Sequence, residues 1–157
     1  MGPIESNFLG PLDGIFSPDG YLLSMKDIPA NFTDLLSDQT KAFASVATVM
    51  KDGSPQVTPV WFDTAGKLIR INTASGRVKA RTIQEGRKIA LSIMDPANPY
   101  RYMQIRGSVK KVTTDGADAH IDKLAKKYLG VDKYPYRQPS ETRVIYKIQP
   151  EHTTTMG

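Results

Sequence analysis

Hydrophobic and polar residues alternate along six short segments of the chain. In one of the clearest, Met103, Ile105 and Val109 share one face, and the positions between them are mostly polar. Because successive side chains of a strand point to opposite faces, this two-residue period predicts half-buried β-strands. The predicted strands cover residues 40–50, 57–62, 67–73, 87–95, 103–113 and 142–149.

A helical period replaces the alternation between the last two of these strands. It predicts a helix over residues 115–129, with charges on its outer face and His120 as a solvated residue. Shorter helices are predicted over residues 34–38 and 76–85. The apolar residues of the long helix that recur at helical spacing are Ala117, Ile121, Leu124 and Tyr128.

Glycine-containing turns separate the first three strands. Residues 51–54 form a hairpin turn of the Asp-Gly kind, and residues 63–66 form a second short connection that ends in glycine. We therefore interpret Asp63 and Asp95 as turn residues rather than as a catalytic pair. The first three strands are expected to run as a meander.

These elements together favour a mainly β fold of the α+β type. Six short strands with few helices fit an antiparallel sheet closed into a barrel, with the helices packed outside it. A length of 157 residues fits one domain. Residues 1–24 are rich in Gly, Pro, Asp and Ser without a period, so we interpret them as an extension, partly disordered or packed on a partner subunit. The domain itself then covers residues 25–157.

The composition narrows the classes of partner. A formal charge of +5 and a pI near 9.4 are compatible with nucleic acid, acidic surfaces or small anionic ligands. The cations are spread along the chain rather than gathered in a tail, which disfavours nucleic acid as the main partner.

Several kinds of chemistry are excluded or disfavoured. The chain has no cysteine, which excludes disulfides, thiolate nucleophiles and cysteine metal sites. Its two histidines, His120 and His152, have no partner at ligand spacing, so no metal site is predicted. No apolar run approaches the roughly 20 residues that span a bilayer, and the first residues lack the pattern of a secretion signal. We therefore expect a cytoplasmic protein without a membrane partner.

The sharpest chemical signal follows the third predicted strand. Ser75 can cap a helix whose first turns carry Arg77, Lys79 and Arg81. Cations at the start of a helix are unfavourable unless a bound anion neutralises them. A solvated basic face is the alternative, and charge alone favours it. Trp61, the only tryptophan, lies on the preceding strand and changes this balance. A flat apolar wall beside an anion clamp would suit a planar ring that carries a phosphate tail.

A series of short motifs extends this picture. The motifs are FASVAT at 43–48, DG at 52–53, PQVTPVW at 55–61, NT at 72–73, GRVKAR at 76–81, DPANPYRY at 95–102 and IRG at 105–107. In their order and spacing they resemble the pyridoxamine-phosphate-oxidase-like split β-barrel family, and within it the branch of reductases that depend on the deazaflavin coenzyme F420. The resemblance covers about residues 26–149 and leaves out the N-terminal extension.

The resemblance implies a six-stranded split β-barrel of the FMN-binding type. It also implies a homodimer with two cofactor sites at the subunit interface, where residues 98–102 of one subunit cover the cofactor ring of the other. The ring lies along residues 57–61, and basic residues grip the phosphate. The implied cofactor-binding residues are Val57, Thr58, Pro59, Val60, Trp61, Asn72, Thr73, Ser75, Arg77, Lys79, Arg81, Asn98, Tyr100 and Arg101.

Three functions follow from these observations. The favoured one is a reductase that uses reduced F420 to transfer hydride to an electron-poor small molecule, such as an enone, a quinone or a tetrapyrrole. The second is an FMN- or haem-binding protein with an oxidase, storage or sensing role. The third is a small basic barrel that stacks single-stranded nucleic acid on Trp61 and tyrosines. No catalytic residue is assigned, and the proton donor can be solvent, Tyr100 or Tyr102.

Overall fold

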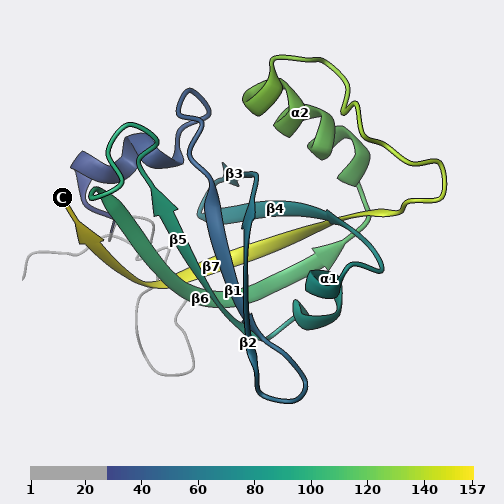
Figure 1. The fold of residues 1–157 in the computed structure, drawn as a ribbon, viewed down its shortest axis with the longest axis horizontal. Helices are drawn as coiled ribbons and strands as arrows, with labels where there is room; N and C mark the ends of the chain where they lie inside the picture. The colour runs from purple at the N-terminus through teal and green to yellow at the C-terminus, as the bar shows by residue number, and fades with distance from the viewer. Residues whose placement is uncertain (1–27) are drawn as a thin grey trace, which may run out of the picture.

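The computed structural model describes residues 28–157, so the predicted extension 1–24 lies outside the described residues (Figure 1). The mainly β architecture is confirmed within this range. The elements in chain order are the 3-10 helix η2 (Ala30–Leu36), β1 (Ala44–Val49), β2 (Pro55–Val60), β3 (Phe62–Ala65), β4 (Leu68–Ala74), α1 (Val78–Thr82), β5 (Lys88–Met94), β6 (Tyr102–Thr113), α2 (Ala117–Leu129) and β7 (Arg143–Met156).

The strands form one antiparallel, curled sheet in the order β2-β1-β5-β6-β7-β4-β3. Strands β2 and β3 lie at opposite edges, although Trp61 alone separates them in the sequence. The prediction of one strand over 57–62 within a meander is therefore wrong, and the described part of the chain has seven strands instead of six. Because the sheet curls, the chain can pass from one edge to the other at Trp61.

The second predicted connection, residues 63–66, is also corrected. Asp63 lies in β3 and pairs with Arg70 of β4, and Gly66 makes the turn with a φ of 59°. A left-handed φ of this kind is one that glycine adopts without steric cost. Asp63 is therefore a strand residue.

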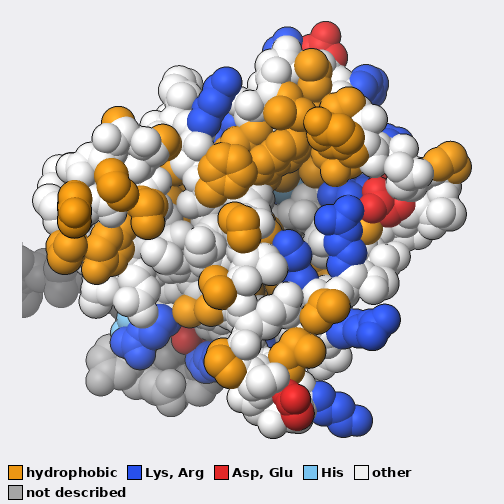
Figure 2. All heavy atoms as spheres, in the orientation of Figure 1, with side chains coloured by type: hydrophobic (Ala, Val, Ile, Leu, Met, Phe, Trp, Pro, Cys, Tyr) orange, Lys and Arg blue, Asp and Glu red, His pale blue; other side chains and the backbone are white. Residues whose placement is uncertain are grey.

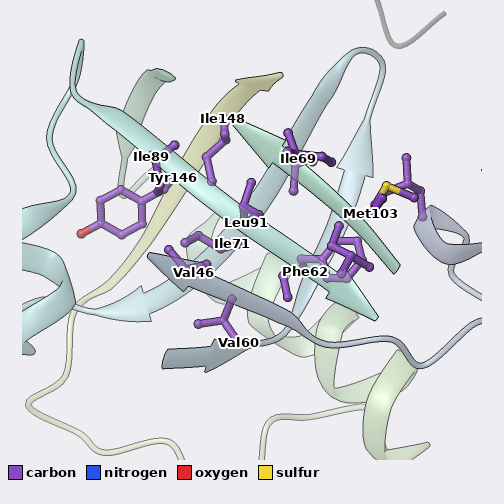
Figure 3. Packing of buried hydrophobic residues seen from close by; sticks show 14 of the residues in the cluster. Val46, Val60, Phe62, Ile69, Ile71, Ile89, Leu91, Met103, Tyr146 and Ile148 are labelled. Atoms are coloured by element: carbon purple, nitrogen blue, oxygen red, sulfur yellow. The ribbon is translucent and has the colours of Figure 1, made fainter. Parts of the chain in front are cut away.

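The main core fills the inside of the curled sheet. Alternate residues of the strands point inward, as the two-residue period predicts, and Met103, Ile105 and Val109 of β6 are all buried. Figure 3 shows how inward side chains from strands far apart in the sequence meet there. The fully buried residues labelled in it include Phe62, Ile69, Ile71, Leu91, Met103, Tyr146 and Ile148.

Strand β7 runs further than predicted, to Met156 rather than residue 149. Proline in a strand interior normally argues against pairing, but here Pro150 lies opposite Gly107, beside a shift in the register of β6 and β7. A Cβ atom on Gly107 would collide with the backbone of Gln149, so the glycine makes room for this close approach. The extension places His152 in a strand, opposite Arg106.

The two short helices differ from their predictions. Helix α1 covers Val78–Thr82 instead of residues 76–85, with Arg77 at its N-cap position and no capping side chain. The predicted cap by Ser75 is therefore wrong. Helix η2 is a 3-10 helix that begins at Ala30, ahead of the predicted residues 34–38.

Helix α2 confirms the predicted apolar face. Ile121, Leu124 and Tyr128 form a second core cluster, against which Trp61 and Tyr134 pack. The hydroxyl of Tyr128 donates to the Ala42 carbonyl at 2.6 Å and accepts from the Phe62 amide at 3.3 Å. Burial of this hydroxyl raises the pKa of Tyr128 to about 12. The helix is thus tied to the β2–β3 crossover.

A buried carboxylate also ties α2 to the sheet. Asp63 is fully buried and accepts hydrogen bonds from Arg70 at 2.8 and 2.5 Å, from His120 at 3.0 Å and from Lys123 at 2.7 Å. Burial alone would raise the pKa of Asp63, but the hydrogen bonds from His120, Arg70 and Lys123 hold it well below its usual range. His120 is 5% exposed, so its predicted position on the solvated face is wrong. The outward charge pattern of the helix is interrupted where it meets Asp63.

No helix within residues 28–157 has both the length and the apolar character needed to cross a membrane.

We predict that Asp63→Asn lowers the free energy of unfolding by about 2–4 kcal/mol, because it leaves buried donors without their carboxylate. The measurement is urea denaturation near neutral pH. Since the pKa of Asp63 is depressed by folding, its contribution exists above the unfolded pKa of about 3.9 and is lost as the pH falls below it. The gap between wild type and variant should therefore shrink progressively below about pH 5.

The matched control is Asp132→Asn, which removes an exposed carboxylate paired with Lys126 at 2.8 Å. Exposed ion pairs contribute little, so this change should leave the urea denaturation midpoint nearly unchanged. Equal effects of the two substitutions would show that Asp63 does not anchor α2.

Candidate functional site

A pocket of about 220 Å³ opens between the β2–β3 crossover, β4, α1 and α2. Figure 2 shows a hollow with hydrophobic side chains on one side and Lys and Arg side chains on another. Half of the sequence-predicted cofactor-binding residues line this pocket. They are Pro59, Val60, Trp61, Asn72, Thr73, Arg77 and Lys79.

Aromatic rings form one wall of the pocket. Trp61 is stacked on Tyr128, with 5.1 Å between ring centroids and 5° between ring planes. Tyr134 meets the Trp61 ring edge-on at 6.0 Å, and Tyr136 meets Tyr134 in the same way at 5.7 Å. Such edge-to-face and offset pairs are favourable arrangements of aromatic rings. The wall is therefore built as one packed unit rather than from separate mobile rings.

Three cations form another side: Arg77, Lys79 and Arg143. Burial, and then the charges of Arg77 and Arg143, lower the pKa of Lys79. Glu141 is the carboxylate beside them, 3.4 Å from Arg77 and 3.2 Å from Arg143. Among residues 28–157 no carboxylate pairs with the Lys79 ammonium. The pocket therefore carries more positive than negative charge and favours an anion.

Arg143 is only 5% exposed, and its side chain is held from several sides. Its Nε donates to Asn72 Oδ1 at 2.9 Å, and its guanidinium carbon lies 5.1 Å from the Tyr134 ring centroid. Its Nη1 is within ion-pair distance of Glu141, but neither that nitrogen nor the Glu141 Oε2 has a partner with hydrogen-bond geometry. A buried guanidinium nitrogen without a well-aligned acceptor fits a site that takes an anionic group.

One carboxylate fixes the loop that supplies the tyrosines. Asp122 of α2 accepts from the Tyr134 backbone amide at 2.8 Å, from Lys133 at 3.1 Å and from Arg137 at 2.8 Å. Burial would raise the pKa of Asp122, but these three hydrogen bonds lower it. The carboxylate therefore stays charged near neutral pH and holds the loop after α2 across the pocket.

The other predicted residues near this site do not line the pocket. Val57 and Thr58 lie on the edge strand β2, and Val57 is 64% exposed. Ser75 precedes α1 and Arg81 lies in its last turn, and both are exposed. The anion side of the pocket is thus made by side chains of α1 and β7 rather than by a capped helix start.

The predicted residues of the β5–β6 loop lie apart from the pocket of their own chain. Asn98 and Tyr100 are exposed, Tyr100 by 76%. Arg101 is engaged by Asp34 at 2.5 Å and by Asp95 at 2.8 Å. Its guanidinium therefore ties this loop to η2.

Five pocket residues were not among those predicted. The aromatic ones could have been suspected, because tyrosines recur within an otherwise polar, proline-containing loop. Arg143 carried no such signal, since a single arginine before a strand is common. The five are Phe43, Ile121, Tyr134, Tyr136 and Arg143.

Solved structures with the same fold include one with clear sequence similarity. A chain named F420 reductase is 32% identical, with a TM-score of 0.69, over 81% of this chain and 98% of that one. Two more distant structures show the fold alone. The HupZ protein of Group A Streptococcus is 22% identical (TM-score 0.55; 82% of this chain and 93% of that one), and General Stress Protein 26 of Bacillus anthracis is 15% identical (TM-score 0.55; 80% and 90%).

A comparison with curated proteins gave no match. The family description pyridoxamine 5'-phosphate oxidase, in contrast, matches residues 30–157, which include every strand of the curled sheet and the whole pocket. The chain therefore belongs to the pyridoxamine 5'-phosphate oxidase family.

Proposed function

We propose that the protein is a reductase that uses reduced coenzyme F420 to deliver hydride to an electron-poor small molecule, such as an enone, a quinone or a tetrapyrrole. The family membership and the similarity to an F420 reductase support the coarser assignment, an oxidoreductase of the flavin and deazaflavin class. A cytoplasmic location remains a prediction.

The observation that carries the proposal is the meeting of an aromatic wall and an unbalanced cation cluster in one pocket. A deazaflavin has a flat tricyclic ring and a phosphate-bearing tail, and the pocket offers a surface for each. When bound, F420 supplies the hydride, and the protein supplies orientation and electrostatics.

Each side chain has a distinct part in this arrangement. Arg77, Lys79 and Arg143 would hold the phosphate, because guanidinium and ammonium groups form the stronger, charge-assisted hydrogen bonds to anions. The strand that ends at Trp61 would line the ring. Tyr134, fixed through Asp122, would limit the access of water to the ring.

FMN is the alternative cofactor, because it also presents a tricyclic ring and a phosphate. The 32% identity to a chain named F420 reductase is the observation that favours the deazaflavin. Titration with both molecules decides between them.

The proposal includes a homodimer with the cofactor site completed by the second subunit. Asn98 and Tyr100 lie outside the pocket of their own chain, which supports the proposal that they cover a ring bound to another copy. The neighbouring strands β1, β2 and β5 also expose large apolar side chains, with Val49 at 61%, Val57 at 64% and Met94 at 46%. A partner subunit on this outer face would bury them.

We predict that Lys79→Ala weakens the binding of F420, and of FMN if it binds, by about 1.5–3 kcal/mol, the range of a hydrogen bond to a charged group. Fluorescence titration of both cofactors measures the change. Lys51→Ala, in the exposed β1–β2 turn, removes the same charge away from the pocket and should leave affinity unchanged. Unaltered affinity of Lys79→Ala for both molecules would mean that the residues that bind the phosphate lie elsewhere.

We predict a dimer in sedimentation equilibrium at micromolar concentration. Replacing Val57 by Glu, on the exposed face of β2, should favour the monomer because it would bury a charge in the interface. A wild-type protein that sediments as a monomer would rule out a site shared between subunits.

A further inference from the structure

A continuous hydrogen-bond chain joins the pocket to the buried carboxylate below α2. Arg143 donates from Nε to Asn72 Oδ1 at 2.9 Å. The Asn72 Nδ2 lies 2.8 Å from the Ala117 carbonyl and 3.2 Å from His120 Nδ1. His120 Nε2 in turn lies 3.0 Å from Asp63 Oδ1. The two ends of the chain, Arg143 and Asp63, are 5% and 0% exposed.

The donors and acceptors in this chain fit in one direction only. The Arg143 Nε can only donate, so the side-chain oxygen of Asn72 must face it. The two hydrogens of the Asn72 amide then point to the Ala117 carbonyl and to His120 Nδ1. His120 must therefore accept at Nδ1 and donate from Nε2 to Asp63, which is the neutral Nε2–H tautomer.

We propose that Asp63 and His120 are positioning residues for the anion clamp, the cation cluster of Arg77, Lys79 and Arg143, and that protonation of His120 removes their support. The two residues fix the Asn72 amide, which directs Arg143 into the pocket. The inference rests on the proposed function, since it concerns the affinity of the same pocket for a phosphate-bearing cofactor.

A proton on His120 Nδ1 places a hydrogen against the hydrogens of Asn72 Nδ2. Turning the Asn72 amide over would relieve this clash. It would also place the amide nitrogen against Arg143 Nε and the amide oxygen against the Ala117 carbonyl. Compared with the original orientation, the turned amide gains one hydrogen bond, from His120 Nδ1, and loses two, those with Arg143 Nε and with the Ala117 carbonyl. The protonated ring therefore weakens the hold on Arg143 in either orientation of the amide.

The groups around His120 come from four elements. On β3, the Asp63 carboxylate faces the ring and is shared with Arg70 of β4 and Lys123 of α2. On β7, Arg143 is linked to the ring through Asn72. Glu141 lies beside Arg143, and Asp38 lies 3.1 Å from Lys123. Clamp strength should therefore be greatest with His120 neutral and should fall as the pH is lowered through its titration.

The first experiment follows the cofactor-free protein by ¹⁵N NMR. The Arg143 Nε–H resonance, assigned by its loss in Arg143→Lys, should shift in step with the titration of the His120 ring. In His120→Gln, which can still donate to Asp63 but does not titrate, the resonance should not respond between about pH 8 and about pH 5.5. His152→Gln removes the other histidine, which lies away from this pocket on β7, and should behave as wild type.

The second experiment measures F420 affinity over the same pH range. Wild type and His152→Gln should bind about tenfold more weakly at the acidic end, the effect of one lost charge-assisted hydrogen bond. His120→Gln should change less than about twofold. The ligand's own titration is common to all three proteins and cancels when they are compared.

An Arg143 resonance that stays fixed while His120 titrates would overturn the positioning role, and this test needs no His120 variant. Wild-type pH dependence of affinity in His120→Gln would overturn it as well. A coupled titration in a protein that binds neither F420 nor FMN at any pH would support the positioning role and refute the proposed function.

Discussion

The unbalanced positive charge of the pocket is the constraint on which the rest of the site depends. Arg77, Lys79 and Arg143 face one space with Glu141 as their neighbouring carboxylate, and their mutual repulsion costs free energy. The structure offsets this cost at Arg143, through Asn72 and the Tyr134 ring, and leaves Lys79 without a carboxylate among residues 28–157. An anionic ligand in this space would reduce the repulsion.

The order of the strands in the sheet brings the three cations next to the aromatic wall. Strands β2 and β3 lie at opposite edges of the sheet, and the curl brings these edges together at Trp61. The crossover is held by the Tyr128 hydroxyl from α2, and Asp63, two residues beyond Trp61, binds the same helix. The helix is thus both the second layer of the fold and the support of the pocket. A pocket built on these contacts is largely formed before a ligand arrives.

Local sequence patterns predicted much of the fold. The two-residue period identified the strands and their buried faces, and the helical period identified the buried face of α2, because both depend on neighbouring residues. Half of the proposed site residues gather in one pocket for a similar reason, since 59–61, 72–73 and 77–79 lie close in sequence. Asn98 and Tyr100 stay predictions, because in our proposal they act on the pocket of a second copy of the chain.

The buried polar network escaped prediction because its partners are far apart in sequence. Asp63 before a glycine-containing turn has the pattern of a turn residue, and His120 among lysines and aspartates has that of a solvated one. Only the tertiary contact, 57 residues apart, buries the two together. Arg143 was missed in the same way, because its importance comes from Asn72, which is 71 residues away. Proline at 150 ended the predicted last strand early, since the room that Gly107 provides lies on another strand.

The most direct test of the account is a crystal structure of the protein with F420, and in parallel with FMN. We expect a cofactor ring beside Trp61 and a phosphate within hydrogen-bond distance of Arg77, Lys79 or Arg143, with the loop that carries Tyr100 contributed by a second copy of the chain. A cofactor bound away from this pocket, with Arg77, Lys79 and Arg143 making no contact with its phosphate, would contradict this expectation.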